Sequence, residues 1–240
     1  MRQIRLFTQQ VLTAHSSIEL EADPAHHLAR VLRARVSDKV LLFNGDGLDW
    51  QGEVSLIEKR RVIVQIETGR PSVAESPLST HLGLSLSKGE RFDWAIQKAT
   101  ELGVTLITPL LSERVDVKLP QDRLAKKLMH WQHIIIAACE QCGRGYIPRL
   151  NKPIALDHWT KTVEADLKLV LHHHQVAPLP DAAPGSVALL VGPEGGLTEA
   201  EVDAASAHGF KRFRMGPRVL RTETAPAAAL SILGSRWGDL

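Results

Sequence analysis

The sequence predicts an α/β protein in which a small N-terminal β-barrel domain precedes a C-terminal domain with a parallel sheet. Before residue 71, short runs with apolar residues at alternate positions are separated by turn residues such as Asn44–Gly47. Beyond residue 75, continuous apolar runs such as Leu167–Leu171 and Val187–Val191 alternate with helical patterns, as in parallel strands covered on both faces. We therefore assign residues 1–71 to the first domain and residues 75–240 to the second.

Local patterns predict each element of the first domain. Strands are expected at Val40–Phe43, Trp50–Leu56 and Val62–Ile66, where apolar residues recur between turns. A short helix is expected at Pro24–Leu32, because proline is well tolerated in a first helical turn. The stretch Thr68–Pro77 is rich in Gly, Pro and Ser and is expected to link the two domains.

The second domain is expected to alternate strands with helices. The expected strands are His81–Leu86, Val104–Thr108, Leu167–Leu171, Val187–Val191 and Phe210–Met215. The expected helices are Phe92–Leu102, Asp122–Cys142, Thr198–His208 and Ala225–Trp237. Gly103 should stop the first helix, Pro109 should end the second strand, and Thr198 with Glu201 should form a capping box.

The composition is that of an ordinary folded protein. Of 240 residues, 44% are hydrophobic and 23% are charged, which excludes disordered and fibrous classes. The longest apolar runs are too short for a membrane span, and we expect no secretory signal. Two cysteines make no disulfide framework, so a cytoplasmic location is expected. The net charge of +2 is too small to indicate a nucleic-acid-binding protein unless basic residues gather on one surface.

Two glycine-rich loops each follow a predicted strand. The first is Gly192–Gly196 and the second is Met215–Arg221. Open α/β sheets bind ligands at the carboxyl ends of their strands, and glycine lets a backbone approach a ligand closely. Neither loop has the Walker A or the GxGxxG pattern, so a P-loop or an ordinary Rossmann dinucleotide site is not expected. The alternative is that both loops are purely structural turns.

Both loops belong to longer motifs that resemble a known family. GPEGGLTEAEV, which begins at Gly192, and MGPRVLRTETA, which begins at Met215, resemble the paired knot motifs of SPOUT methyltransferases. More narrowly, they resemble the bacterial RsmE-like 16S ribosomal RNA (uridine-N3) methyltransferases. Further matches in the family's order are Lys88–Glu90, Ile96–Lys98, Glu101–Val104, Ser112–Arg114, Glu140–Arg144 and Ile147–Pro148. Matches to the family's PUA-like RNA-binding domain are His26–Leu28, Val31–Arg33 and Phe43–Gly47.

This resemblance implies an enzyme that holds S-adenosyl-L-methionine, bent, in a deep trefoil knot. The implied cofactor contacts lie at the ends of three strands and in the loops after them: Leu171, His172, Gly192, Pro193, Glu194, Gly195, Met215, Gly216, Arg218, Val219 and Leu220. The family is also homodimeric, with the active site completed across the interface. The apolar face of the last helix is expected to be available for that contact, through Leu230, Ile232, Leu233 and Trp237.

The implied acceptor is N3 of one uridine in the 16S ribosomal RNA of the small subunit. Uracil N3 carries a proton and becomes a good nucleophile only when that proton leaves. Arg218 and Arg221 suit the stabilisation of negative charge on the uracil oxygens, the alternative being contact with phosphate or solvent alone. Glu194 and Glu223 are the nearest carboxylates, and one of them is expected to be the base or to orient an arginine. Their alternative role is to brace the loops.

Candidate RNA contacts are basic residues of the first domain and of one turn in the second: Arg2, Arg5, Arg30, Arg33, Arg35 and Arg144. At helical spacing Arg30 and Arg33 share a face, and such a patch attracts phosphates. Aspartates are interspersed among these residues, so a solvated surface is the alternative.

Two other functions stay open at this point. One alternative is a related SPOUT enzyme that methylates another base nitrogen or a ribose oxygen. The other is a non-catalytic RNA-binding or ribosome-assembly factor that retains the fold. No metal is expected. The single CxxC of Cys139–Cys142 cannot complete a four-ligand zinc site, and the consecutive histidines at 172–174 point to alternate sides of an extended chain.

Overall fold

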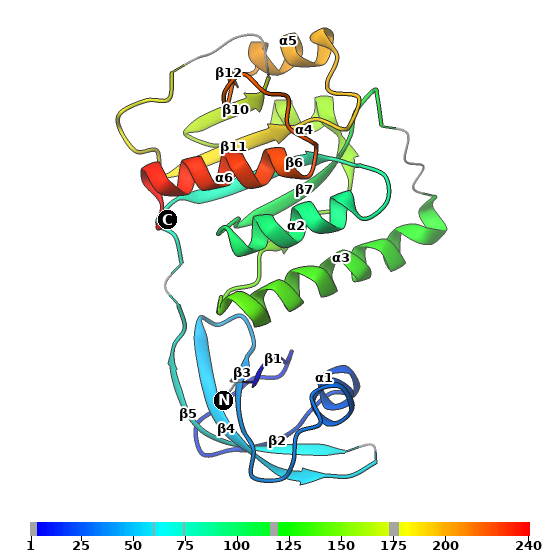
Figure 1. Cartoon of the computed structure of the whole chain (residues 1–240), viewed down its shortest axis with the longest axis vertical. Helices are drawn as coiled ribbons and strands as arrows, with labels where there is room; N and C mark the ends of the chain where they lie inside the picture. Colours follow the sequence, from blue (N-terminus) through cyan, green and yellow to red (C-terminus); the bar gives the residue numbers. More distant parts are fainter. Residues whose placement is uncertain (1–3, 60, 74, 116–119, 173–177) are drawn as a thin grey trace. The chain divides into compact units, whose positions relative to one another are not determined.

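The computed structural model describes residues 4–59, 61–73, 75–115, 120–172 and 178–240. Its internal contacts divide the chain into two compact units, each drawn in Figure 1. The first unit comprises Met1–Ala74 and Cys139–Ile147, and the second comprises Glu75–Ala138 and Pro148–Leu240. The first of these divisions lies between Ala74 and Glu75, and the assignment of Cys139–Ile147 to the first unit was not expected.

The first unit is built on a mixed sheet. Its strands lie in the order β1 (Ile4–Phe7), β3 (Lys39–Phe43), β4 (Leu48–Ile57), β5 (Val62–Pro71) and β2 (Ser17–Glu19). The β1–β3 pair is parallel and the other pairs are antiparallel, with register shifts in β4–β5 of the kind that bend a sheet. In the described residues the end strands β1 and β2 do not pair with each other, so the expected barrel takes the form of an open sheet.

All three strands expected in this unit are confirmed, but the expected linker begins too early. β5 continues to Pro71, beyond the predicted start of the linker at Thr68. The reason is a cross-strand pair in which Trp50 lies opposite Gly69. A Cβ on Gly69 would lie 3.1 Å from the indole of Trp50, so this glycine gives the aromatic ring a place to pack within the sheet.

The predicted N-terminal helix is present as α1 (Ala22–His26), which passes directly into one π-helical turn, η1 (His27–Val31). Ala25 and Leu28 point from these turns into the core of the unit. Leu32 caps the end of η1, and Arg33 adopts a left-handed backbone with φ 54°. The expectation that Arg30 and Arg33 share a helical face is therefore wrong, because Arg33 lies past the last turn.

The second unit contains a parallel sheet, as predicted. In the described residues its strands lie in the order β12 (Phe210–Phe213), β10 (Leu167–Leu171), β11 (Ser186–Val191), β6 (Ser79–Ser85), β7 (Leu106–Leu111) and β8 (Arg149–Leu150). A further short strand, β9 (Ile154–Ala155), also pairs with β7. Strands β10 and β11 are buried almost throughout, as their continuous apolar sequences indicated.

Pro109 lies inside β7 and does not end it, which corrects the prediction. β8 pairs with Leu106 and Ile107, and β9 pairs with Leu110 and Leu111, so this edge of β7 has a gap between the two short strands. Proline has no N–H to donate, and it is tolerated where no strand needs that donor. The gap therefore accommodates Pro109.

Helices cover both faces of this sheet. Figure 1 shows α2 (Arg91–Glu101) and α6 (Thr224–Trp237) on one face and α4 (Leu156–Thr162) and α5 (Glu199–Ala207) on the other. The remaining helix, α3 (Gln121–Cys142), matches its predicted range closely. Gly103 follows α2 with φ 84°, as expected of a residue that ends a helix. No helix in the described part of the chain combines the length and apolarity needed to cross a membrane.

The expectation that α6 offers an apolar face for dimer formation is wrong for three of its four residues. Leu230, Leu233 and Trp237 are between 0% and 9% exposed and are buried in the core. Ile232 alone of the four is exposed, at 39%. The helix uses its apolar side to pack onto its own sheet, because a parallel sheet needs cover on both faces.

Candidate active site

A cavity of about 830 Å³ lies at the carboxyl ends of β10, β11 and β12. Its walls are the end of β10, the loop after β11 and the long connection between β12 and α6. Parallel strands place their carboxyl ends at one edge of the sheet, so loops far apart in the sequence meet there. The cavity falls within the range typical of small-molecule and cofactor sites.

The structure brings the sequence-predicted residues together at this cavity. All of the expected cofactor contacts line it: Leu171, His172, Gly192, Pro193, Glu194, Gly195, Met215, Gly216, Arg218, Val219 and Leu220. The four candidate catalytic residues line it too: Glu194, Arg218, Arg221 and Glu223. Two loops that were linked in the sequence only by motif resemblance thus share one cavity.

Glycines shape the first loop. A Cβ on Gly192 would lie 2.9 Å from Cγ of Leu197, so only glycine fits where the loop folds back on itself. Gly196 has φ +70° and donates its N–H to the Pro193 carbonyl, at 2.8 Å, closing a tight turn. The predicted capping box follows, with Thr198 and Glu201 hydrogen-bonded reciprocally at the start of α5. Hydrogen bonds of the turn and of the capping box therefore fix the conformation of this loop.

Glu194 is a structural acceptor in this loop. Its Oε1 accepts hydrogen bonds from the Lys88 N–H at 3.0 Å and from Arg91 Nη1 at 2.9 Å. Partial burial opposes the charged form, but backbone N–H donors and Arg91 outweigh it and lower the pKa of Glu194. A carboxylate stabilised in this way is a poor proton acceptor. The geometry therefore favours the loop-bracing alternative for Glu194 over the role of general base.

Arg91 and Arg114 line the cavity and were given no role by the sequence reasoning. Arg91 pairs with Glu194, and Arg114 donates from Nη1 to the Gly195 carbonyl at 2.8 Å. They follow β6 and β7, whose carboxyl ends lie on the same edge of the sheet as the loops. That shared edge is the signal by which the two arginines could have been found.

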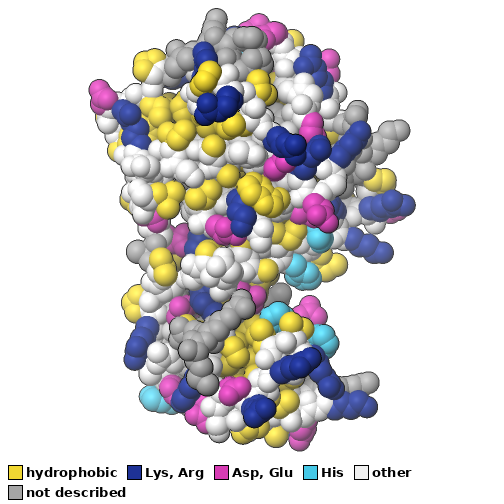
Figure 2. All heavy atoms as spheres, viewed as in Figure 1, with side chains coloured by type: hydrophobic (Ala, Val, Ile, Leu, Met, Phe, Trp, Pro, Cys, Tyr) yellow, Lys and Arg dark blue, Asp and Glu magenta, His cyan; other side chains and the backbone are white. Residues whose placement is uncertain are grey.

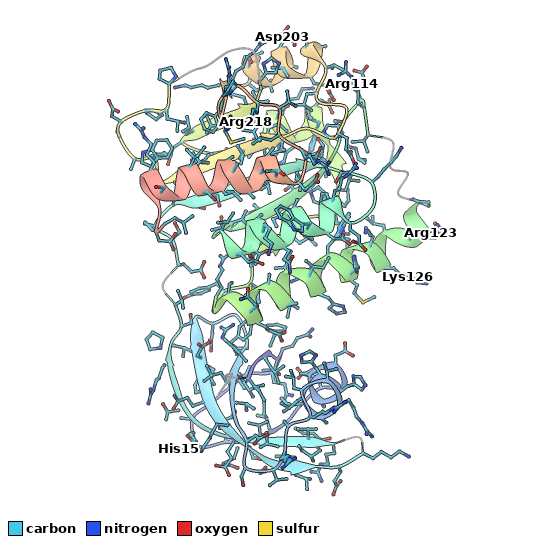
Figure 3. The ribbon with its side chains drawn as sticks, in the orientation of Figure 1. His15, Arg114, Arg123, Lys126, Asp203 and Arg218 are labelled. Carbon is cyan, nitrogen blue, oxygen red and sulfur yellow. The ribbon has the colours of Figure 1, made fainter. Side chains whose placement is uncertain are left out.

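The connection between β12 and α6 is open and basic. Arg218, Val219 and Arg221 are exposed, and Val219 is 80% exposed. Gly216 has φ +107°, a backbone conformation that glycine adopts readily. Figure 3 labels Arg218 in this connection and Arg114 in the loop after β7. Within the described residues, neither Arg218 nor Arg221 has an ion-pair partner, so both guanidinium groups are available to a ligand.

Glu223 stands directly before α6 in a different setting from Glu194. Its Oε2 is buried and, in the described part of the chain, accepts no hydrogen bond. A buried carboxylate oxygen without a donor is uncommon in folded proteins. Of the two candidate carboxylates, Glu223 is therefore the one with a buried oxygen that has no hydrogen-bond donor among the described residues.

The histidine at the end of β10 faces a carboxylate. His172 Nε2 lies 3.3 Å from Oε1 of Glu199, and the His172 side chain is only 6% exposed. The neighbouring histidines 173 and 174 lie outside the described residues. Cys139 and Cys142 are not joined in a disulfide, and the described residues contain no cluster of three or more His, Cys, Asp or Glu arranged to hold a metal ion.

The expected RNA contacts divide into exposed and buried residues. Arg30, Arg33 and Arg35 are exposed, and Figure 2 shows Lys, Arg and His side chains over the region of α1. Arg144 is only 7% exposed, and the side chain of Arg5 is likewise 7% exposed. The expectation that Arg5 forms part of an exposed basic surface is therefore wrong, whereas the expectation that Arg144 reaches RNA stays a prediction. Arg2 lies outside the described residues.

Arg5 is instead a structural residue of the first unit. It donates two hydrogen bonds to Asp49 Oδ1, at 2.7 and 3.0 Å. It also donates to the carbonyls of Cys139 and Arg144, at 2.7 and 2.8 Å. Its guanidinium lies 3.7 Å from the ring centroid of Phe43. These contacts use most of its donors, and they explain why Cys139–Ile147 belongs to this unit.

Comparison with known proteins identifies the family. A family model described as an RNA methyltransferase domain matches residues 74–234, and one described as an RNA methyltransferase PUA domain matches residues 20–67. The ribosomal RNA small subunit methyltransferase E of Buchnera aphidicola subsp. Schizaphis graminum is 35% identical, over 98% of this chain and 97% of that protein. The Bacillus subtilis protein of the same name is 29% identical, over 94% of this chain and 93% of that protein.

Solved structures agree with this assignment. The ribosomal RNA small subunit methyltransferase E of Neisseria gonorrhoeae, bound to S-adenosyl methionine, matches with a TM-score of 0.93 and 36% identity over the whole of both chains. A putative methyltransferase from Legionella pneumophila, in complex with the same cofactor, matches with a TM-score of 0.97 and 41% identity, again over both whole chains. The chain belongs to the ribosomal RNA small subunit methyltransferase E family.

Proposed function

We propose that this chain transfers the methyl group of S-adenosyl-L-methionine to N3 of one uridine in the 16S ribosomal RNA of the small subunit. The observation that carries the proposal is the single cavity of about 830 Å³ on which all of the expected cofactor residues converge. The relatives from Neisseria gonorrhoeae and Legionella pneumophila, which share this fold, were solved with that cofactor.

The cavity residues fit this cofactor. Gly192 and Gly196 keep side chains out of the first loop, so its backbone groups can approach an adenine or a ribose closely. Met215, Val219 and Leu220 supply apolar surface for the flat ring. When bound, the sulfonium supplies a methyl group that is already electrophilic. The trefoil knot implied by the family stays a prediction with which this convergence of loops is compatible.

Residues of the chain must then help the acceptor uracil lose its N3 proton. As the N3 proton leaves, negative charge develops on O2 and O4 of the uracil, and positive groups nearby stabilise it. Arg218 and Arg221 are exposed at the cavity and suit this role. The buried, unused oxygen of Glu223 suits the proton acceptor. Glu194 is committed to Lys88 and Arg91 and braces the loop.

RNA docking is proposed for the exposed part of the first unit. Arg30, Arg33 and Arg35 are exposed and have no ion-pair partner among the described residues. Each phosphate neutralised by such a side chain contributes about 0.7 to 0.9 to the slope of log affinity against log salt. Replacement of all three by Ala should lower that slope by about 2. An unchanged slope would remove this surface from the proposal.

We also propose that the protein is a cytoplasmic homodimer, as the family resemblance implies. Ile232 is a large apolar residue of α6 that stays exposed, at 39%. Light scattering on the purified chain tests the oligomeric state, and a monomer at micromolar concentration would reject the dimer.

The decisive experiment is transfer of tritiated methyl from S-adenosyl-L-methionine to small ribosomal subunits that lack the native modification. Nucleoside mapping by mass spectrometry should then find 3-methyluridine at one position. A methyl group on another base nitrogen or on a ribose would point to a different SPOUT activity, and cofactor binding without transfer would favour an assembly factor. Arg221→Ala should cut transfer strongly while cofactor affinity stays within a few-fold. Wild-type turnover would remove Arg221 from the mechanism.

A further inference from the structure

A second hollow, of about 690 Å³, adjoins the cofactor cavity in the same unit. We call it the side hollow, and its lining residues are Lys88, Gly89, Glu90, Arg91, Trp94, Glu223 and Thr224. It shares Arg91 and Glu223 with the cofactor cavity, so these two residues form a common wall. We propose that the side hollow receives the acceptor base, a uracil swung out of the RNA and stacked on Trp94. This inference rests on the proposed function and names its substrate subsite.

Trp94 is the observation that points to a base. At 41% it is the most exposed of the five tryptophans, whereas Trp131 and Trp159 are almost fully buried. An exposed indole beside a ligand cavity offers a flat apolar face, which is the surface that proteins use to hold unstacked RNA bases. Trp94 lies on α2 in the turn after Arg91, so its ring borders the common wall.

The chemistry of the common wall matches a uracil ring. Lys88 and Arg91 line the side hollow beside Glu90, and the two cations suit the phosphates on either side of the base. Glu223 Oε2 is buried there without a hydrogen-bond donor in the described residues. The N3–H of uracil is a donor, and Glu223, which lines the hollow, carries a carboxylate that can accept it.

The proposed transfer step accounts for every bond, electron pair and proton at this common wall. The N3–CH₃ bond forms while the S–CH₃ bond breaks. The electron pair of the S–CH₃ bond stays on sulfur, so S-adenosyl-L-homocysteine leaves as a neutral thioether. The N3 proton passes to the Glu223 carboxylate. Because Glu223 lines both hollows, one residue can accept the proton from a base in the side hollow while the methyl donor occupies the cofactor cavity.

Photochemical crosslinking tests the stacking directly. Small subunits are reconstituted with 16S RNA that carries 5-iodouridine, bound with S-adenosyl-L-homocysteine, and irradiated. The peptide joined to the mapped acceptor uridine should contain Trp94. The crosslink should survive in Trp94→Phe and in Met129→Ala, a control that changes a 58% exposed side chain of α3 outside both hollows. It should be lost in Trp94→Ala.

Kinetics give an independent reading. Stacking of one base on an aromatic residue corresponds to roughly 10-fold or more in affinity, so Trp94→Ala should lower kcat/KM for the RNA at least 10-fold. Trp94→Phe should restore most of it, and calorimetry should find cofactor affinity within about twofold in both variants. Three results would overturn this inference without affecting the proposed function. They are an unaltered kcat/KM in Trp94→Ala, a crosslink to a peptide that lacks Trp94, and a dimer that dissociates in Trp94→Ala. A wild-type chain that transfers no methyl group would overturn the proposed function as well.

Discussion

Replacement of Glu194 by Gln separates the two roles that the sequence left open for this residue. Gln keeps an oxygen that can accept hydrogen bonds from the Lys88 N–H and from Arg91, but it cannot take up a proton or carry a charge. If Glu194 braces the loop, the variant should bind the cofactor somewhat more weakly and still transfer methyl groups. If Glu194 is the general base, transfer should fall by orders of magnitude with little change in cofactor affinity.

The structure sets the size of the effect. Hydrogen bonds to a charged group contribute about 1 kcal/mol more than neutral ones, and Oε1 accepts two of them. The side chains of Glu194 and Arg91 are 33% and 48% exposed, so solvent screens much of this difference. About 1 kcal/mol remains, which corresponds to a roughly fivefold rise in the Kd of the cofactor. Glu194→Ala, which removes both bonds, should raise the Kd roughly 30-fold.

Calorimetry with S-adenosyl-L-methionine and tritiated-methyl transfer measure these two quantities separately. Because the pKa of Glu194 is lowered from 4.5, the carboxylate stays charged through the working range. The gap in affinity between wild type and Glu194→Gln should therefore be constant from pH 8 to pH 5 and shrink only below pH 4.5. Glu164→Gln, which changes an exposed carboxylate outside the cavity, is the matched control. Abolished transfer in Glu194→Gln at unchanged cofactor affinity would refute the reasoning.

Three stability predictions follow from buried contacts, each measurable by urea unfolding. Arg5→Ala leaves Asp49 without its ion-pair partner and should lower the free energy of unfolding of the first unit by about 3–5 kcal/mol. Arg5→Lys should not restore this stability, because an ammonium lacks the forked donors of a guanidinium. A loss below about 1 kcal/mol in Arg5→Ala would contradict the structural role assigned to Arg5. Gly83→Ala places a methyl group 2.5 Å from the indole of Trp159 and should lower the free energy of unfolding by about 1–3 kcal/mol. The loss of stability should be smaller when Trp159 is also replaced by Phe. Burial lowers the pKa of His81 from 6.5 to about 4, so below pH 6.5 the unfolded chain takes up a proton that the folded chain refuses. Stability should fall by up to about 3 kcal/mol between pH 6.5 and pH 4, and His81→Gln should flatten that part of the profile.

Periodicity predicted the elements that are long or fully buried. Strands β10 and β11 and helix α3 appear almost as predicted, because their apolar patterns match the environment that the sheet gives them. The elements that were missed are short: β1, β2, β8 and β9 have two to four residues each, and α4 has seven. Such segments carry too few residues for a period, and pairing with distant strands decides their conformation.

The candidate site divides in a similar way. The residues of both glycine-rich loops follow directly on the strands that carry them, so motifs alone located them. Arg91 and Arg114 reach the same cavity from two other strands, and their role depends on a hydrogen bond that crosses about 80 to 100 positions of sequence. The error over Arg5 has the opposite cause. An arginine near the chain's start resembles a solvated cation in the sequence, and only the folded unit brings Asp49 and two carbonyls to its guanidinium.

The same distinction bears on the two candidate carboxylates. Glu194 and Glu223 each lie beside a glycine-rich loop or a cation, and nothing in the surrounding sequence favours one over the other as the proton acceptor. Hydrogen-bond satisfaction does rank them, because a carboxylate already held by N–H donors is stabilised in its charged form. Glu194 is held by donors that follow β6, whereas Glu223 keeps one oxygen buried and unused at the wall between two hollows. A proton acceptor needs an available lone pair, and on that criterion we propose Glu223 rather than Glu194 for this role.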